Sequence, residues 1–525
     1  MREKIIAAFC LSILFGSVLS AKSIRFRCMW RDDPSTTMVV GWDQVSGNRP
    51  VLYYGPSDQG TNCNAYPKSK QPDQVISAKG MNNHFVRLSG LIPNTVYYFV
   101  IKDSEGLSQR YSFKTVPNDP EKRLSIIAGG DSRNHREARC NANMLVSKLR
   151  PHCVMFDGDM TADDTAPAWR NWFDDWQYTI GSDGRLFPII AARGNHEASN
   201  QSIADLFDVK HEELYYALNL GGDLVRIYTL NSLLPASGNQ KAWLEKDLKN
   251  NSQITWKLAQ YHNTIRPHTS SKPERDDLLL NWATLFYKYQ VNLAIESDAH
   301  VVKWTYPIRP SREPGSEEGF IRDDIRGTVY IGEGGWGAPL RASNDNKSWT
   351  RDSGSFNQFK WIFIDQYGIE IRTIRTDGAN RVAEVNHNNI FNPPIGLVIW
   401  SPSNGDVVKI LNSNPPPPAV QQELLVSKKP NPNIPPAKDD WAGIQPLDID
   451  FSTGGVSVDY KLKTTCDVTI ILINKEMKEV TRALLKGQAP GPYIKKLDMN
   501  KISAGEYLLI IKANNQVIRR CKIKK

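Results

Sequence analysis

Cysteine is scarce in this chain of 525 residues, which has seven cysteines and no C-x-x-C pair. The missing spacing excludes the common paired-cysteine zinc site. Cys10 lies in an apolar N-terminal stretch. The other six form three near-neighbour pairs, one in each proposed domain: Cys28 and Cys63, Cys140 and Cys153, Cys466 and Cys521. An even number permits disulfides in an exported protein, and buried free thiols are the alternative.

Long apolar runs are absent after residue 20, so we expect no transmembrane segment in the mature chain. At the N-terminus, Arg2 and Lys4 precede the apolar stretch Ile5–Leu19, which is short for a membrane span. Small residues follow, with a cut expected at about Ser20 or Ala21. The pattern predicts a signal peptide over residues 1–20, with a membrane anchor as the alternative.

A strong charge bias is also missing, because 65 basic residues face 56 acidic ones, for a net charge of +9. Residues 446–525 carry 15 basic against 8 acidic residues, so most of the excess lies near the C-terminus. A solvated basic face explains this better than nucleic-acid binding. We therefore expect no nucleic-acid-binding surface.

The chain is too long for one ordinary core, and its apolar fraction of 40% is enough for several. Residues 22–117 contain short runs rich in β-branched and aromatic residues, such as Thr37–Trp42 and Thr95–Ile101, separated by turn signals. This predicts an all-β sandwich. The stretch Leu88–Tyr98 resembles the end of a fibronectin type III-like module, which implies a positioning role without chemistry.

Residues 121–411 alternate strands with helices, which predicts an α/β layered domain. Helical patterns cover 136–149 and 276–289, and a closing hairpin is expected at 360–365 and 370–374. Five buried-type strands are expected at Leu124–Ala128, Val154–Phe156, Phe187–Ala192, Trp256–Gln260 and Val291–Ile295.

The end of the chain changes character again. Residues 412–445 are proline-rich and predict a stiff linker, and residues 446–525 return to short β segments. The stretch Ser503–Ile511 followed by Val517–Lys525 resembles the C-terminal sorting domain of type IX secretion substrates. That resemblance implies secretion machinery as a partner. A plain β-sandwich accessory or sugar-binding domain is the alternative.

Polar side chains follow each of the five expected strands. They are Asp131, then Asp159, then Asn195 with His196, then His262, then Asp298 with His300. Ligand sites in α/β sheets gather beyond the carboxyl ends of strands. Carboxylate oxygens and imidazole nitrogens suit Zn, Mn or Fe, and one Asp can bridge two cations ~3.5–4 Å apart. Singly, each residue is more often a turn residue or a hydrogen-bonded His, but the ordered set predicts one metal centre.

These residues, with Gly194-Asn195-His196-Glu197 as the most specific piece, resemble the calcineurin-like metallophosphoesterase signature. Together with the preceding β module, residues 25–410 resemble the purple acid phosphatases. The resemblance implies a four-layer α/β sandwich. It also implies roles for seven residues: Asp131 and His300 bind the first metal, Asp159 bridges, Asn195 and His262 bind the second, His196 faces the substrate phosphate, and His268 is a further substrate-side histidine. Arg133, two residues after Asp131, could clamp a phosphate oxygen or simply pair with a surface carboxylate.

Two positions depart from the family pattern. Ala162 replaces a tyrosine that binds ferric iron, and Asp298 replaces a histidine. A carboxylate at position 298 can still bind a hard divalent cation. Asp163, Asp164 and His135 could compensate, or be ordinary polar loop residues.

The sequence thus predicts a secreted or cell-surface phosphoesterase with two divalent ions, drawn from Fe, Zn, Mn and Mg. It would hydrolyse phosphate monoesters by a metal-activated hydroxide. A phosphodiesterase or nucleotidase on the same scaffold is one alternative. The other is a non-catalytic surface protein on a decayed metallophosphoesterase scaffold, which Ala162 and Asp298 favour.

Overall fold

The computed structural model describes residues 22–413, 455–462, 465–474, 478–498, 502–503, 505–513 and 516–524. The chain divides into two compact units, residues 1–417 and 418–525. The expected signal peptide and nearly all of the expected linker lie outside the described residues. Within the described ranges, no helix is long and apolar enough to cross a membrane.

A ten-stranded sheet runs through the first unit and joins the two predicted domains. Its N-terminal part meets the rest where β1 pairs with β11 in parallel, with Met29 opposite Ile189. The two domains therefore share one sheet. In spatial order its strands are β23 (Val408–Leu411), β22 (Gly368–Arg375), β21 (Gln358–Asp365), β9 (Leu124–Gly129), β10 (Cys153–Phe156), β11 (Ile189–Ala191), β1 (Ser23–Met29), β2 (Met38–Gln44), β6 (Met81–Leu88) and β5 (Gln74–Ala78).

A second, four-stranded sheet covers the N-terminal part of that sheet and completes a β-sandwich. Its strands are β4 (Lys68–Lys70), β3 (Val51–Gly55), β7 (Val96–Lys102) and β8 (Tyr111–Lys114). Apolar side chains from both sheets, such as Trp42 of β2 and Phe99 of β7, lie in one buried cluster. A 3-10 turn, η1 (Cys63–Ala65), packs beside β3 and β7.

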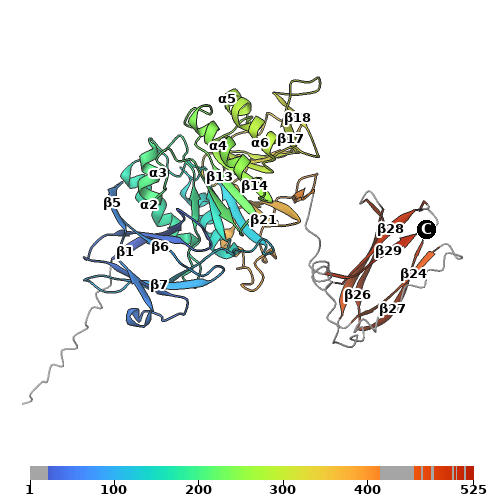
Figure 1. Cartoon of the computed structure of the whole chain (residues 1–525), viewed down its shortest axis with the longest axis horizontal. Helices are drawn as coiled ribbons and strands as arrows, with labels where there is room; N and C mark the ends of the chain where they lie inside the picture. Colours follow the sequence, from blue (N-terminus) through green and yellow to red (C-terminus); the bar gives the residue numbers. More distant parts are fainter. Residues whose placement is uncertain are drawn as a thin grey trace, which may run out of the picture. The chain divides into compact units, whose positions relative to one another are not determined.

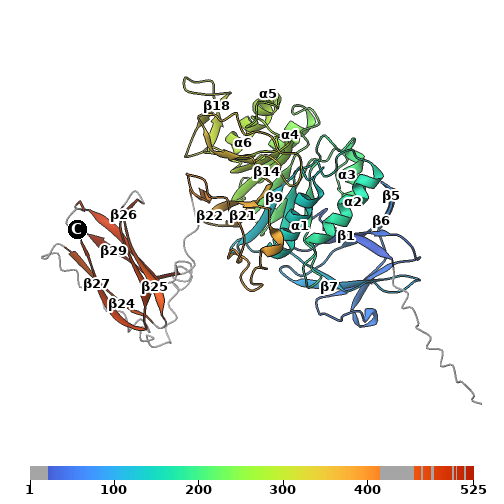
Figure 2. The same ribbon diagram turned by 180° about the vertical axis from the view of Figure 1, so that it is seen from behind.

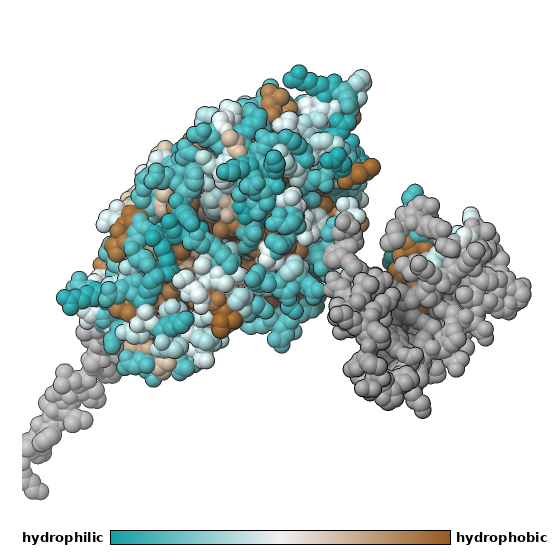
Figure 3. All heavy atoms as spheres, viewed as in Figure 1, coloured by the Kyte–Doolittle hydropathy of each residue, from teal (hydrophilic) through white to brown (hydrophobic). Residues whose placement is uncertain are grey.

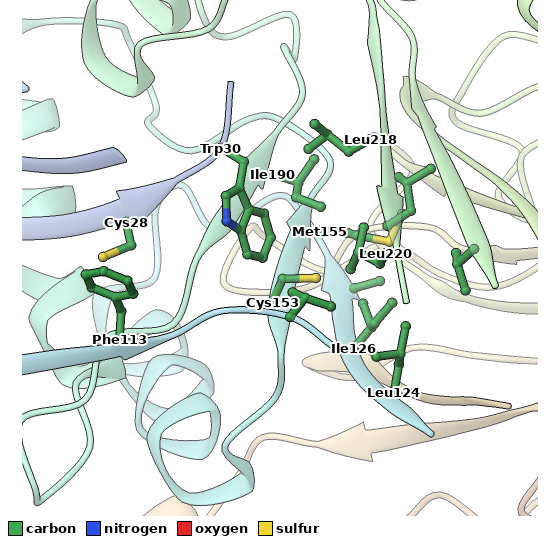
Figure 4. Packing of buried hydrophobic residues seen from close by; sticks show 14 of the residues in the cluster. Cys28, Trp30, Phe113, Leu124, Ile126, Cys153, Met155, Ile190, Leu218 and Leu220 are labelled. Atoms are coloured by element: carbon green, nitrogen blue, oxygen red, sulfur yellow. The ribbon is translucent and has the colours of Figure 1, made fainter. Parts of the chain in front are cut away.

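The remaining large sheet has seven strands and faces the ten-stranded one. In order they are β12 (Tyr216–Leu220), β13 (Val225–Thr229), β14 (Trp256–Asn263), β15 (Leu293–Ser297), β19 (Val329–Gly332), β16 (Val302–Thr305) and β20 (Thr350–Gly354). A small hairpin, β17 (Ile308–Pro310) and β18 (Phe320–Arg322), lies beside it. Side chains of β9 and β10 meet those of β12 in the core between the two sheets (Figure 4).

Helices cover the outer face of each large sheet, which gives four layers (Figures 1 and 2). The helices over the ten-stranded sheet are α1 (Arg136–Leu149), α2 (Ala166–Trp176) and α3 (Asn200–Phe207), with short turns η2 (Gln177–Thr179) and η4 (Ala379–Arg381). Those over the seven-stranded sheet are α4 (Asn239–Asn250), α5 (Asp276–Leu278) and α6 (Thr284–Tyr289). A π-helical turn, η3 (Leu279–Ala283), joins α5 to α6, so one continuous helical segment covers the predicted span 276–289.

The sequence of α2 shows why a helix forms there. Thr165 caps its N-terminus by accepting a hydrogen bond from the Ala168 amide, and Pro167 lies in the first turn. Trp169, Phe173 and Trp176 recur at helical spacing and are buried. These apolar side chains pack the helix against the sheet that contains β9, β10 and β11.

The near-neighbour disulfides expected for the first two cysteine pairs are wrong. Cys28, Cys63, Cys140 and Cys153 are all free thiols. Cys28 and Cys63 lie in separate hydrophobic clusters, and burial raises the pKa of the Cys28 and Cys153 thiols far above its usual range. The third pair includes Cys521, whose side chain is outside the described part.

The second unit is a small all-β unit. A four-stranded sheet consists of β26 (Glu479–Gln488), β25 (Cys466–Ile473), β28 (Glu506–Ala513) and β29 (Gln516–Lys524), and β24 (Gly455–Leu462) pairs with β27 (Gly491–Asp498). The core of this unit contains Val468, Ile470, Leu509 and Ile511.

On the face of the first unit seen in Figure 3, apolar residues are scattered among hydrophilic ones, as on an ordinary protein surface.

One buried ion pair ties α2 to the loop that follows β9. Asp175 is fully buried and accepts hydrogen bonds from Arg139 and Arg136, while Arg139 also donates to the Ser132 carbonyl oxygen at 3.0 Å. Removing Asp175 leaves the Arg139 cation buried without its partner.

We expect Asp175→Ala to lower the free energy of unfolding of the first unit by about 3–5 kcal/mol. The neighbouring Asp174 pairs with Arg25 at an exposed position, so Asp174→Ala should cost less than about 1 kcal/mol. Urea unfolding of both variants measures the difference. Equal costs for the two would contradict the importance assigned to the buried pair.

Candidate metal centre

The polar residues predicted at the five strand ends meet where the two large sheets face each other. Strands β9, β10 and β11 run parallel in one sheet, and β14 and β15 run parallel in the other. His262 Nδ1 lies 2.9 Å from the Asp157 carbonyl oxygen, and the Asp298 amide donates to Asp131 Oδ2 at 2.7 Å. These bonds tie the strand ends of one sheet to those of the other.

Four of the candidate ligands have left-handed backbones, which non-glycine residues rarely adopt. Their φ values are 58° for Asp131, 54° for Asp159, 67° for Asp298 and 55° for His300. Strain of this kind persists only where the surroundings over-determine the conformation, and it clusters at functional sites. Here it occurs one to three residues beyond β9, β10 and β15, at residues whose side chains come together.

Two glycines let the loops approach closely enough. A Cβ at Gly194 would lie 2.3 Å from the amide nitrogen of Asp159, and one at Gly334 would lie 2.2 Å from Asp131 Oδ2. Any side chain at these positions would push an aspartate out of place.

The candidate ligands form two groups that share Asp159. Asp131, Asp159 and His300 bring one ligand atom each to within 4.8 Å of one another, and so do Asp159, His262 and Asp298. Asp159 Oδ2 is buried and has no hydrogen-bond partner within the described residues. A buried carboxylate oxygen without a donor fits a bridging position between two cations, and the oxygen and imidazole donors suit divalent ions. We call these groups the first and second cation positions.

Both ligand histidines are oriented by backbone carbonyl oxygens. His300 Nδ1 donates to the Pro339 oxygen at 2.7 Å, and His262 Nδ1 donates to the Asp157 oxygen at 2.9 Å. A carbonyl can only accept, so Nδ1 carries the proton and Nε2 faces the cation position in both rings. His262 Nε2 also lies 2.9 Å from Asn195 Oδ1, which places Asn195 at the second position.

The negative charge of the cluster changes the pKa of His262. Burial alone would lower that pKa, but the carboxylates of Asp159, Asp131 and Asp298 raise it well above its usual value. Excess negative charge therefore surrounds the second position and favours a cation there.

His196 and Arg133 lie at the edge of the cluster. His196 Nδ1 donates to the Ala162 carbonyl oxygen at 2.6 Å, and its Nε2 lies 3.7 Å from Asp159 Oδ2. Arg133 Nη2 is 3.2 Å from His300 Nε2, and its Nε is 3.4 Å from Asp159 Oδ2. Both side chains are partly exposed, at 27% and 13%, so both can reach a molecule that enters from solvent.

The structure does not bring His268 to the cluster, where a substrate-side role was expected. Its ring is fully buried, with Nε2 bonded to Thr350 Oγ1 at 2.7 Å and Nδ1 3.4 Å from Glu333. Glu333 in turn pairs with the buried Lys303. His268 therefore belongs to an internal charge network.

The three residues that could have compensated for the departures have other roles. Asp164 is buried and bonds Trp169, Ser202 and Lys79. Asp163 is exposed and accepts from Thr165, and His135 is an exposed residue at the N-terminus of α1.

Two supporting residues were not assigned roles from the sequence. Glu197 is fully buried and accepts from the amides of Asp159, Met160 and Gly194, which clamps the loops after β10 and β11 together. Burial and the nearby Asp159 charge raise its pKa to about 7. The position of Glu197 in the motif Gly194–Glu197 was a sequence signal that could have identified it. Lys272, which bonds Asp298 Oδ1, lies in no motif that could have identified it from the sequence.

Comparison with known proteins agrees with this architecture. Residues 25–115 match the family of purple acid phosphatase N-terminal domains, and residues 133–302 match the calcineurin-like phosphoesterases. A yellow lupin (Lupinus luteus) seed purple acid phosphatase structure superposes with a TM-score of 0.58 at 15% identity, covering 74% of each chain.

Similar sequences occur in bacteria and plants. An uncharacterised protein of Mycobacterium tuberculosis is 24% identical over 371 residues, 59% of this chain and 68% of that one. Purple acid phosphatase 13 of Arabidopsis thaliana is 22% identical over 269 residues, 41% of this chain and 48% of that one.

These matches confirm the predicted fold class. The chain combines a purple acid phosphatase N-terminal β-sandwich, a metallophosphoesterase α/β domain and a small C-terminal β unit. Over residues 133–302 the matching family is that of the calcineurin-like phosphoesterases, and the fold is shared with a purple acid phosphatase structure. The metallophosphoesterase fold binds two divalent metals, and the Asp and His groups described above could hold them.

We expect Asp159→Asn to weaken Mn²⁺ binding at both positions, because the substitution removes the shared anionic oxygen. Asp131→Asn should weaken only the first position. Asp163→Asn, in the same loop but exposed, should bind as the unmodified protein does. Isothermal titration with Mn²⁺ measures this, and an Asp159→Asn variant that loses only one site would argue against a bridging role.

Proposed function

We propose that this protein hydrolyses phosphate monoesters at a centre that holds two divalent cations, drawn from Fe, Zn, Mn and Mg. The observation that carries the proposal is the shared Asp159, whose buried Oδ2 lacks a hydrogen-bond partner within the described part of the chain. Asp131 and His300 would complete the first position, and Asn195, His262 and Asp298 the second. When bound, two such cations supply a hydroxide near neutral pH and neutralise charge on phosphoryl oxygens.

His196 is suited to hold a proton for the leaving group. Its Nδ1–H is fixed by the Ala162 carbonyl oxygen, so a protonated ring directs Nε2–H towards the cluster. The Ala162 backbone therefore orients the ring, although its side chain offers no metal ligand. In this proposal His196 donates to the ester oxygen as the bond to phosphorus breaks.

Arg133 is suited to bind the phosphoryl group. Its Nε is buried without a hydrogen-bond partner among the described residues, at 3.4 Å from Asp159 Oδ2. A guanidinium group with free donors can bind two oxygens of a phosphate at once. Arg133 would thus orient the substrate between the cluster and His196.

The first test is hydrolysis of p-nitrophenyl phosphate after addition of Mn²⁺, Zn²⁺, Fe²⁺ or Mg²⁺. We expect activity with at least one ion and a loss of roughly 10²-fold or more in kcat for His196→Gln. His268→Gln is the matched control, because that ring contacts Thr350 and Glu333 rather than a candidate ligand.

Three outcomes separate the alternatives. Faster cleavage of bis-p-nitrophenyl phosphate than of the monoester would favour a phosphodiesterase or nucleotidase. Absence of bound metal together with absence of activity would favour a non-catalytic protein on a decayed scaffold. A kcat for His196→Gln equal to that of the control would remove His196 from the mechanism.

We also propose export, on the sequence patterns of residues 1–20 and 446–525. The C-terminal β unit would then serve as a sorting domain for secretion machinery, and the enzyme would act outside the cell or on its surface. Deleting residues 446–525 should trap active enzyme in the periplasm. Arrival of the truncated protein at the cell surface or in the medium would refute the sorting role.

A further inference from the structure

The carboxylate of Asp298 has a donor on each oxygen. The Lys272 ammonium group bonds Oδ1, and Asn263 Nδ2 donates to Oδ2 at 3.2 Å. Asp298 is also a member of the second cation position, where its Oδ1 lies 3.7 Å from His262 Nε2. The same oxygen therefore faces both a lysine and the space for a metal ion.

The ammonium group of Lys272 can move away from Asp298 Oδ1 without a change in the backbone. Lys272 lies in the segment between β14 and α5, its side chain is 20% exposed, and its backbone amide is anchored by the Thr269 carbonyl oxygen at 3.3 Å. A lysine has a flexible four-carbon stem and three donors at its tip. The backbone can therefore stay in place while the ammonium group moves.

An ammonium group and a divalent cation compete for this position. Like charges separated by a few ångströms repel strongly where water is largely excluded, and Asp298 is itself only 12% exposed. Without a cation, Lys272 offsets the negative charge that a carboxylate at position 298 adds. With a cation bound, the same ammonium group lies beside a positive ion.

We propose that Lys272 is a movable counter-ion of the second cation position. Its ammonium group pairs with Asp298 when the position is empty, and turns to an anionic oxygen of the bound phosphate when a cation occupies it. The inference rests on the proposed function and adds Lys272 to it as a substrate-positioning residue. Asp298 can be a carboxylate because Lys272 is there to balance it.

The experiment measures two affinities of the full chain, first for Mn²⁺ and then, with Mn²⁺ bound, for inorganic phosphate. For Lys272→Met we expect Mn²⁺ to bind about tenfold more tightly at one position, because the competing charge is gone. Phosphate should bind about tenfold more weakly, because a cationic donor is lost. Lys272→Gln, which keeps a donor without the charge, should match Lys272→Met for Mn²⁺.

Lys241→Met is the matched control. Lys241 is also a partly buried lysine with one hydrogen bond, to Asn281 at 3.1 Å, and it lies on α4 away from the cluster. Both of its affinities should equal those of the unmodified protein.

The outcomes separate this inference from the proposed function. If the unmodified protein binds Mn²⁺ and Lys272→Met binds it equally or more weakly, Lys272 only supports Asp298 and the inference is overturned while the function stands. Unchanged phosphate affinity in Lys272→Met also overturns it. If the unmodified protein binds no divalent cation, the proposed function fails and the inference fails with it.

Discussion

The structure of the centre depends on the carboxylate of Asp159. It follows β10, and it belongs to both groups of candidate ligands. Its backbone is left-handed, its amide is held by the buried Glu197, and its Oδ1 accepts from the His196 amide at 2.8 Å. These contacts leave Oδ2 as a buried oxygen without a hydrogen-bond donor. It is therefore free to serve as the ligand that the two cation positions share.

Charge balance is the second constraint. Asp131, Asp159 and Asp298 gather in a largely buried space, and such a group is unstable unless cations offset its charge. The chain supplies cationic side chains at both positions, with Arg133 near Asp159 and His300, and Lys272 on Asp298. The same side chains carry the positive charge needed to bind a phosphate. One set of residues can therefore serve the centre both without cations and with cations and phosphate bound.

The N-terminal sandwich contributes to rigidity in a way that a linked domain would not. Its strand β1 pairs with β11, the strand that precedes the loop with Gly194 and Asn195. The loop with His196 is therefore anchored to a sheet that extends through both predicted domains. This fits the positioning role that the resemblance to a fibronectin-type module implied.

The order and type of most elements, and the set of residues at the strand ends, are predictable from local sequence patterns. Helix α1 matches its predicted span, and β9, β10, β14 and β15 lie within one or two residues of the predicted start, because these patterns are local. Other features depend on contacts between segments that are distant in the sequence. Lys272 and Asp298 are 26 positions apart, His268 turns towards Glu333, and Cys28 and Cys63 pack in separate clusters. Each of these three features depends on the path of a loop or on the packing of a sheet. Spacing along the chain does not fix that path or that packing, because both are set by contacts between distant segments.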